Sequence, residues 1–164
     1  MYQKIMVPLD GSQLAECVLP HVEAFIQGCQ VHTVIFVRVV EAASPRFLGA
    51  PTATSHVDYR QVSKYIKIIE GERKNAAAEY LQAVVGRLKR KGVKFQKEVL
   101  VGNVADQLVD FIVAMNIDLI IIATHGRSGV SRWVRGSVAD RILRASSAPV
   151  LMVRAPGIMS ERKK

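Results

Sequence analysis

The clearest sign of a buried strand is the run Asp118-Leu119-Ile120-Ile121-Ile122-Ala123. Branched apolar residues without polar alternation are typical of a parallel strand that is covered on both faces. Residues 31–40 form a second run of this kind, and residues 3–9 and 148–153 form shorter ones. Residues 93–101 also favour a strand, but their polar interruptions indicate the edge of a sheet. We therefore expect five strands.

Helical patterns separate these strands. Ser12 is a candidate N-cap for a helix that runs to about Gly28, and Pro20 predicts a kink or a local break inside it. Asn103 is expected to cap a second helix, and residues 137–145 are expected to form another. Strands that alternate with helices predict a three-layer α/β sandwich with a five-stranded parallel sheet. Right-handed crossovers favour the strand order 3-2-1-4-5.

The middle of the chain is less regular. Residues 41–57 contain Pro, Gly, Thr and Ser, and a loop of this length is typical of a lid or a disordered segment. Residues 58–91 favour a helix, but one straight helix would be about 51 Å long, so we expect a break at Gly71. Gly92 is expected to cap the C-terminus of this stretch. We assign residues 1–155 to one domain and residues 156–164 to a polar, basic tail.

Composition narrows the class of protein. The chain has 164 residues, of which 49% are hydrophobic and 23% are charged, as in an ordinary globular domain. No apolar run reaches the roughly 18–20 residues that span a bilayer, because Asn116 and Asp118 interrupt the longest one. The N-terminus lacks the apolar core of a signal peptide. We therefore expect a cytoplasmic protein without a membrane segment.

The thiols and the net charge add two expectations. Cys17 and Cys29 would lie about 18 Å apart on one helix, too far for a disulfide, so we expect two free, buried thiols.

The net charge of +9 indicates either an anionic partner or a solvated basic surface. Because aromatic residues make up only 6% of the chain and no reading motif occurs, any binding to nucleic acid is expected to be non-specific.

A ligand site is expected where the strand order reverses, at the carboxyl ends of the first and fourth strands. The first strand ends in Pro8-Leu9-Asp10-Gly11-Ser12, and the fourth ends in Ala123-Thr124-His125-Gly126-Arg127-Ser128-Gly129. The glycines of the second stretch let a ligand approach the backbone. Further along, Gly136 leads into a helix at Ser137, and a helix N-terminus suits phosphate. The arginines of this loop suit phosphate as well: they are Arg127, Arg132 and Arg135.

Each of these features has a structural alternative. Ser137 and Asp140 can also form a capping box. Asp10 suits the hydroxyls of a ribose, but Asp10-Gly11-Ser12 also suits an Asx turn. Neither a P-loop nor a G-x-G-x-x-G motif occurs. His125 has no acid or nucleophile beside it in the sequence, so no catalytic residue is assigned.

Four stretches of the chain resemble the universal stress protein family. They are Lys4-Ile5-Met6-Val7-Pro8-Leu9-Asp10-Gly11-Ser12, Ile120-Ile121-Ile122-Ala123-Thr124-His125-Gly126-Arg127-Ser128-Gly129, Gly136-Ser137-Val138-Ala139 and Ala148-Pro149-Val150-Leu151-Met152-Val153. The resemblance extends over about residues 2–154, and it implies a Rossmann-like fold of the adenine nucleotide alpha hydrolase type. It also implies a homodimer that forms through the last strand, from Ala148 to Val153.

One subgroup of this family binds ATP through a pattern of Gly, two residues, Gly, nine residues, Gly, and Ser or Thr. Here the pattern has Ala123, Gly126, Gly136 and Ser137, so that alanine replaces the first glycine. The resemblance implies binding of ATP, or of ADP or AMP, together with Mg²⁺ or Mn²⁺. The ion would be held mostly by phosphate oxygens, and no metal ligand is assigned to the protein. A methyl group at Ala123 would crowd the nucleotide.

The resemblance also implies which residues form the nucleotide site. Asp10 would bind the ribose, the backbone of Val39 would meet the adenine, and the loop from Gly126 would wrap the phosphates. Arg38, beside Val39, would contribute to the site or only to its rim. The full set is Pro8, Leu9, Asp10, Val39, Ala123, Thr124, His125, Gly126, Arg127, Ser128, Gly129, Gly136, Ser137 and Val138.

Three functions are compatible with these observations. The first is an ATP-binding regulatory module of the stress response. The second is a slow ATPase or a protein that phosphorylates itself, although the sequence places no base near a γ-phosphate. The third is a family member that binds no nucleotide and acts through protein partners, and Ala123 is the residue that favours it.

Overall fold

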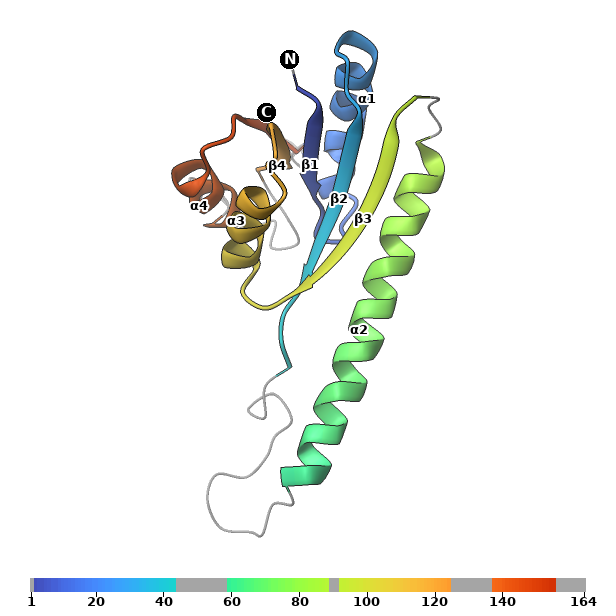
Figure 1. The fold of residues 1–164 in the computed structure, drawn as a ribbon. Coiled ribbons are helices and arrows are strands. Elements are labelled where there is room, and N and C mark those ends of the chain that lie inside the picture. The colour runs from blue at the N-terminus through green and yellow to red at the C-terminus, as the bar shows by residue number, and fades with distance from the viewer. Residues whose placement is uncertain (1, 44–58, 89–91, 125–136, 156–164) are drawn as a thin grey trace, which may run out of the picture.

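The computed structural model describes residues 2–43, 59–88, 92–124 and 137–155. Five strands form one sheet in which all pairs are parallel, and its order is β3-β2-β1-β4-β5 (Figure 1). The strands are β1 (Lys4–Pro8), β2 (Thr33–Val40), β3 (Lys94–Val101), β4 (Leu119–Ala123) and β5 (Val150–Val153). The expected strand order is confirmed, and β3 lies at an edge as its polar pattern predicts.

Helices cover both faces of the sheet. One face carries the short 3-10 helix η1 (Ala15–Val18), α1 (Leu19–Gly28) and α2 (Tyr59–Arg87). The other face carries α3 (Val104–Ala114) and α4 (Ser137–Ala145). Figure 1 shows these two groups on opposite sides of the strands. The three-layer α/β sandwich is thus confirmed.

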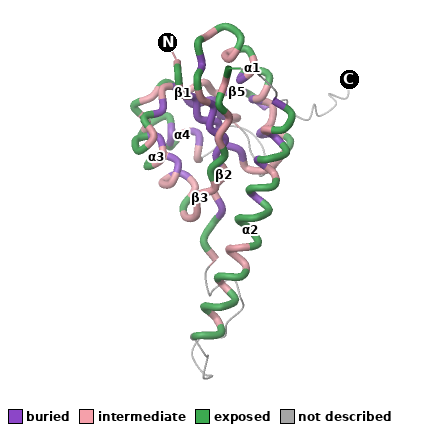
Figure 2. Tube along the Cα trace, turned by 45° about the vertical axis from the view of Figure 1, so that its right-hand side comes forward, coloured by how far each residue is buried: buried purple, intermediate pink, exposed green. Residues whose placement is uncertain are grey.

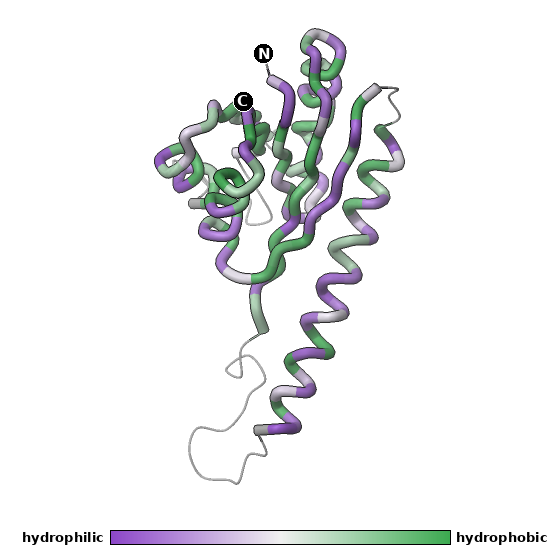
Figure 3. Tube along the Cα trace, in the orientation of Figure 1, coloured by the Kyte–Doolittle hydropathy of each residue, from purple (hydrophilic) through white to green (hydrophobic). Residues whose placement is uncertain are grey.

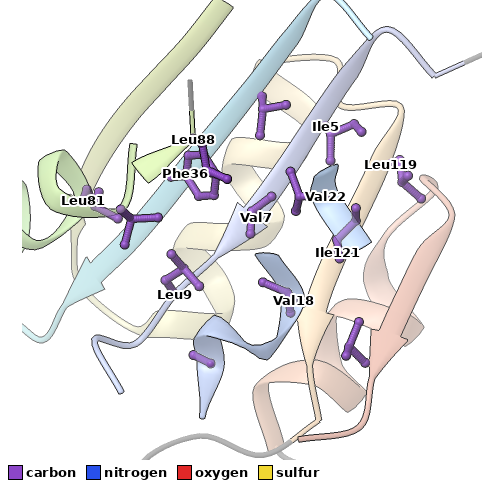
Figure 4. Close-up of a cluster of buried hydrophobic side chains, with 14 of the residues drawn as sticks. Ile5, Val7, Leu9, Val18, Val22, Phe36, Leu81, Leu88, Leu119 and Ile121 are labelled. Carbon is purple, nitrogen blue, oxygen red and sulfur yellow. The ribbon is translucent and has the colours of Figure 1, made fainter. Parts of the chain in front are cut away.

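Two apolar clusters hold the layers together, one on each face of the sheet. Alternate residues of β1 divide between them: Ile5 and Val7 face α1 and α2, and Met6 faces α3 and α4. Figure 4 shows the first cluster, where Phe36 of β2 lies near Leu81 and Leu88. Figure 2 shows the buried residues gathered along the strands. Because both faces of the sheet are covered, the inner strand β4 is an uninterrupted apolar run, whereas the edge strand β3 contains polar residues.

The predicted break at Pro20 is confirmed. The chain forms η1 up to Val18, and Pro20 then occupies the first turn of α1. Proline is tolerated there because the first N–H groups of a helix have no partner within it. The predicted N-cap at Ser12 is wrong, because η1 has Leu14 as its N-cap; the Oγ of Ser12 accepts the N–H of Ala15 at 3.1 Å in the preceding turn.

The predicted break at Gly71 is wrong. Helix α2 is continuous over 29 residues. Its buried residues begin at Ala77, and its N-terminal half extends beyond the carboxyl ends of the strands (Figure 1). Figure 3 shows mixed hydropathy along this half. A long helix does not have to fit inside a small domain, and one interior glycine costs only about 1 kcal/mol.

The connections around α2 also differ from expectation. The helix ends at Arg87, so Gly92 is not its C-terminal cap. Gly92 instead has a φ of +89° in the turn before β3. Residues 44–58 and 89–91 lie outside the described residues, so the lid interpretation of residues 41–57 stays a prediction. The side chain of Glu70 accepts the N–H of Ala43 at 3.1 Å, which ties the exit of β2 to α2.

The remaining local predictions have mixed outcomes. Asn103 caps α3, because its Oδ1 accepts the N–H groups of Ala105 and Asp106 at 3.1 and 3.2 Å. Cys17 and Cys29 are free thiols as predicted, but both are half-buried rather than buried. Within the described ranges, no helix is both long and apolar enough to cross a bilayer. The tail, residues 156–164, lies outside them.

Candidate functional site

Three neighbouring strands end together at the carboxyl edge of the sheet. Pro8 of β1 pairs with Val37 of β2, and the N–H of Leu9 donates to the carbonyl of Val37 at 2.9 Å. On the other side of β1, Thr124 follows β4, and its N–H donates to the carbonyl of Val153 in β5 at 2.8 Å. The strand order reverses between β1 and β4, since β2 lies on one side of β1 and β4 on the other. The predicted ligand site therefore coincides with a topological switch point.

Asp10 lies two residues after β1 and forms an Asx turn. Its Oδ1 accepts the N–H of Ser12 at 2.8 Å and the hydroxyl of Ser12 at 2.7 Å. Between them, Gly11 has a φ of +88°, a conformation that favours glycine. The Asx-turn alternative is thus confirmed, and it fixes the orientation of the Asp10 carboxylate at the edge of the sheet.

The other predicted residues at these strand ends contribute in different ways. Pro8 and Leu9 are buried, and the side chain of Leu9 packs in the cluster under α1 and α2. Val39 is half-buried and faces the opposite layer, against the cluster under α3 and α4. The side chain of Leu9 is therefore part of the core, and its backbone alone reaches the edge.

The fourth strand and the last helix bring a second group of predicted residues to this region. Ala123 and Thr124 are half-buried at the end of β4. Ser137 is the first residue of α4, and the half-buried Val138 packs against the core under that helix. Asp140 pairs with Nε of Arg144 at 2.9 Å. His125, Gly126, Arg127, Ser128, Gly129 and Gly136 lie outside the described residues, and their roles stay predictions.

One interaction beside Asp10 was not predicted. The guanidinium of Arg38 lies over the ring of Tyr80 in α2, with its Cζ 5.2 Å from the ring centroid. Burial raises the pKa of the Tyr80 hydroxyl well above its usual range, and the nearby carboxylates of Glu16 and Asp10 raise it further, while Arg38 opposes them. Four charged or polar groups, from the turn after β1 and from η1, β2 and α2, therefore interact at this corner of the sheet.

The described residues offer no ready metal site. Within the parts of the chain that the structure describes, no three His, Cys, Asp or Glu side chains are grouped so that they could hold a metal ion. Any divalent ion at this edge would depend on oxygen atoms that a ligand brings, because Mg²⁺ commonly binds through substrate phosphates.

Comparison with known proteins identifies relatives over nearly the whole chain. The model of the universal stress protein family matches residues 1–154. The universal stress protein MJ0531 of Methanocaldococcus jannaschii is 31% identical over 156 residues, which cover 95% of this chain and 84% of that protein. MJ0577 of the same organism is 27% identical over 158 residues, which cover 94% of this chain and 96% of that protein.

Solved structures agree with this result. The structure of MJ0577 has a TM-score of 0.78 at 25% identity, and the match covers 95% of this chain and 98% of that one. A universal stress protein family member from Arabidopsis thaliana, solved with AMP bound, has a TM-score of 0.60 at 14% identity and shares the fold, with 94% of this chain and 92% of that one covered. On the match of its sequence over residues 1–154, this chain belongs to the universal stress protein family.

Proposed function

We propose that this universal stress protein binds an adenine nucleotide, ATP in the first place, at the carboxyl edge of β2, β1 and β4. The observation that carries the proposal is the position of three residues at the carboxyl ends of adjacent parallel strands, at the switch point. Asp10 follows β1, Thr124 follows β4, and Val39 lies near the end of β2. Such an edge is where open α/β sheets bind ligands. The AMP in the related Arabidopsis structure supports the choice of an adenine nucleotide.

Each group at the edge has a chemical role in this proposal. The Asp10 carboxylate accepts hydrogen bonds from the ribose hydroxyls, and the backbone of Val39 contacts the adenine. The loop that contains Gly126, Arg127, Ser128, Gly129 and Gly136 wraps the phosphates, and the N-terminus of α4 at Ser137 and Val138 donates N–H groups to them. Mg²⁺ or Mn²⁺ is held mostly by phosphate oxygens.

The proposed role is regulatory. Nucleotide that binds the folded state alone stabilises it. We assign no catalytic residue, and any hydrolysis or self-phosphorylation is slow. We further propose a cytoplasmic homodimer that forms through residues 148–153, since β5 is the edge strand of the sheet.

The first experiment identifies the bound ligand. The protein is purified under native conditions and denatured, and the supernatant is separated by ion exchange with mass detection. Stoichiometric ATP, ADP or AMP is the expected result. A protein that is empty and also gives no heat with added MgATP in calorimetry overturns the proposal and favours a role through protein partners.

A pair of glycine variants tests the position of the site. Gly126→Glu is expected to abolish the rise in melting temperature that MgATP causes, because it places a carboxylate among the phosphates. Gly28→Glu is the matched control, since Gly28 ends α1 in an exposed position where an added Cβ meets nothing within 4 Å. Equal responses to MgATP in both variants would contradict the proposed location.

A further inference from the structure

The turn that carries Asp10 rests on a side chain from the neighbouring strand. A Cβ placed on Gly11 would lie 2.8 Å from Nη2 of Arg38, 2.9 Å from its Cζ and 3.1 Å from its Nη1. Three atoms of the guanidinium therefore cover the place where any other residue would have its side chain. The absence of a Cβ at Gly11 allows this close approach, and its φ of +88° shapes the turn.

The guanidinium also contacts an aromatic ring. Its Cζ lies 5.2 Å from the centroid of the Tyr80 ring, within the range of a cation–π interaction. Tyr80 stands in the part of α2 that packs on the sheet, between the fully buried residues Ala77 and Leu81. The planar group of Arg38 thus approaches both the backbone of Gly11 and a ring on the helix that packs on the sheet.

The same corner has a second link between α2 and the segment after Asp10. Arg87 pairs with Glu16 of η1 at 2.7 Å. The side chain of Arg87 is 56% exposed, so solvent weakens this ion pair. Arg38 is half-buried and lies directly against the turn, so solvent screens its contacts less than those of Arg87.

We propose that Arg38 is a positioning residue for ribose recognition: seated on Tyr80, its guanidinium fixes the Gly11 turn and so orients the Asp10 carboxylate toward the ribose hydroxyls. The proposal rests on the proposed function. A carboxylate that is held in its binding orientation before the ligand arrives loses less freedom on binding. Arg38 need not touch the nucleotide to act in this way.

The test separates recognition of the ribose from recognition of the rest of the nucleotide. Calorimetry measures the Kd of ATP and of 2′,3′-dideoxy-ATP, which lacks both ribose hydroxyls, for the wild type and for Arg38→Met. We expect Arg38→Met to weaken ATP about tenfold, equivalent to about 1.4 kcal/mol, and to leave dideoxy-ATP nearly unchanged. In the Asp10→Asn background, Arg38→Met is expected to have no further effect on ATP.

Three further variants control for folding and for the ring. Arg141→Met removes an exposed arginine that pairs with Asp106 in the opposite layer, and it should leave both Kd values unchanged. Tyr80→Leu should reproduce the effect of Arg38→Met, whereas Tyr80→Phe keeps the ring and should keep the affinity. Circular dichroism and melting curves of the unliganded variants show whether each is folded.

The outcomes are distinguishable. If the wild type binds no nucleotide, the proposed function fails and the role of Arg38 fails with it. If the wild type binds ATP but a folded Arg38→Met binds both nucleotides as tightly as the wild type, the role of Arg38 alone is wrong. Equal losses for ATP and dideoxy-ATP, or a full loss that persists in the Asp10→Asn background, would also overturn it. If Arg38→Met does not fold, the same criteria are applied to Tyr80→Leu.

Discussion

Lys4 and Asp118 are joined by two hydrogen bonds that run in opposite directions. The N–H of Lys4 donates to Oδ2 of Asp118 at 2.7 Å, and the N–H of Asp118 donates to the carbonyl of Lys4 at 3.0 Å. The same Oδ2 accepts the N–H of Gln3 at 3.0 Å, and the Lys4 ammonium donates to the carbonyl of Met115 at 2.7 Å. One carboxylate thus fixes where β1 and β4 begin to pair.

Loss of this carboxylate should destabilise the fold. Asp118→Ala leaves the N–H groups of Gln3 and Lys4 without their acceptor, and we expect the free energy of unfolding to fall by about 1–3 kcal/mol. Asp118→Asn keeps one oxygen acceptor and should lose less. Urea denaturation measures both variants. If Asp118→Ala unfolds at the same urea concentration as the wild type, the link contributes no stability.

Replacement of Gly71 should stabilise the protein. Gly71 lies inside the continuous helix α2, and a Cβ placed on it meets nothing within 4 Å. We expect Gly71→Ala to raise the free energy of unfolding by about 0.5–1 kcal/mol, because alanine has the higher helix propensity. Gly86→Ala, in the last turn of the same helix and equally free of contacts, is the matched variant. A loss of stability in Gly71→Ala, seen in denaturant titration, would contradict an unbroken helix.

Removal of the Tyr80 hydroxyl should also stabilise the protein. Among the described residues its oxygen is buried without a partner in hydrogen-bonding geometry, although Glu16 and Asp10 lie near enough to act on its pKa. An unpaired buried hydroxyl costs about 1–3 kcal/mol, so Tyr80→Phe should unfold at a higher urea concentration at pH 7. Lower stability in Tyr80→Phe would show that the hydroxyl has a partner.

The stability difference between Tyr80→Phe and the wild type should depend on pH in alkaline solution. The pKa of Tyr80 is raised in the folded state, so above the ordinary tyrosine pKa of about 10 the unfolded chain loses this proton first. Stability then falls as pH rises, by at most about 1.4 kcal/mol per pH unit for one group. The advantage of Tyr80→Phe should therefore grow above about pH 10. Urea titrations at pH 8 and pH 10.5 measure it, and an unchanged difference would contradict the raised pKa.

Ala123→Gly should tighten nucleotide binding if the proposed site is correct. It removes the methyl group at the half-buried end of β4 and matches the glycine that the ATP-binding pattern has there. Calorimetry should show a lower Kd for MgATP, while a glycine in a strand costs about 0.5–1 kcal/mol of stability. Ala114→Gly, at the exposed C-terminal end of α3 and outside both the proposed site and the proposed dimer interface, controls for the added flexibility. Equal Kd values for Ala123→Gly and the wild type would mean that the methyl group does not crowd the ligand.

The sequence is sufficient to predict most of the fold. Strands such as Leu119–Ala123 are apolar on both faces, which is typical of a parallel sheet with helices on each side. The cap at Asn103 and the break at Pro20 are also predictable, because each depends only on a few neighbouring backbone groups. Gly71 is misleading, because propensity is a weak signal that neighbouring helix-forming residues outweigh.

The candidate site is less predictable. The ends of β1 and β4 follow from topology, so the position of Asp10 is predictable, but the orientation of its carboxylate depends on a turn with two equally good interpretations. The contact between Arg38 and Tyr80 joins a strand to a helix far along the chain. Tyr80 has the helical spacing of a core residue beside Leu81, so no pattern in the sequence distinguishes it as a partner for a cation.

The pairing of Lys4 with Asp118 has a consequence for synthesis. The two residues are 114 positions apart, although β1 is the central strand and leaves the ribosome first. At about 5–20 residues per second, β1 can pair with β2 early, but its other edge waits several seconds or more for β4. During that time the unpaired edge of β1 can form hydrogen bonds with a strand of another chain. The nascent chain is therefore most vulnerable to aggregation in the interval before residue 124 emerges.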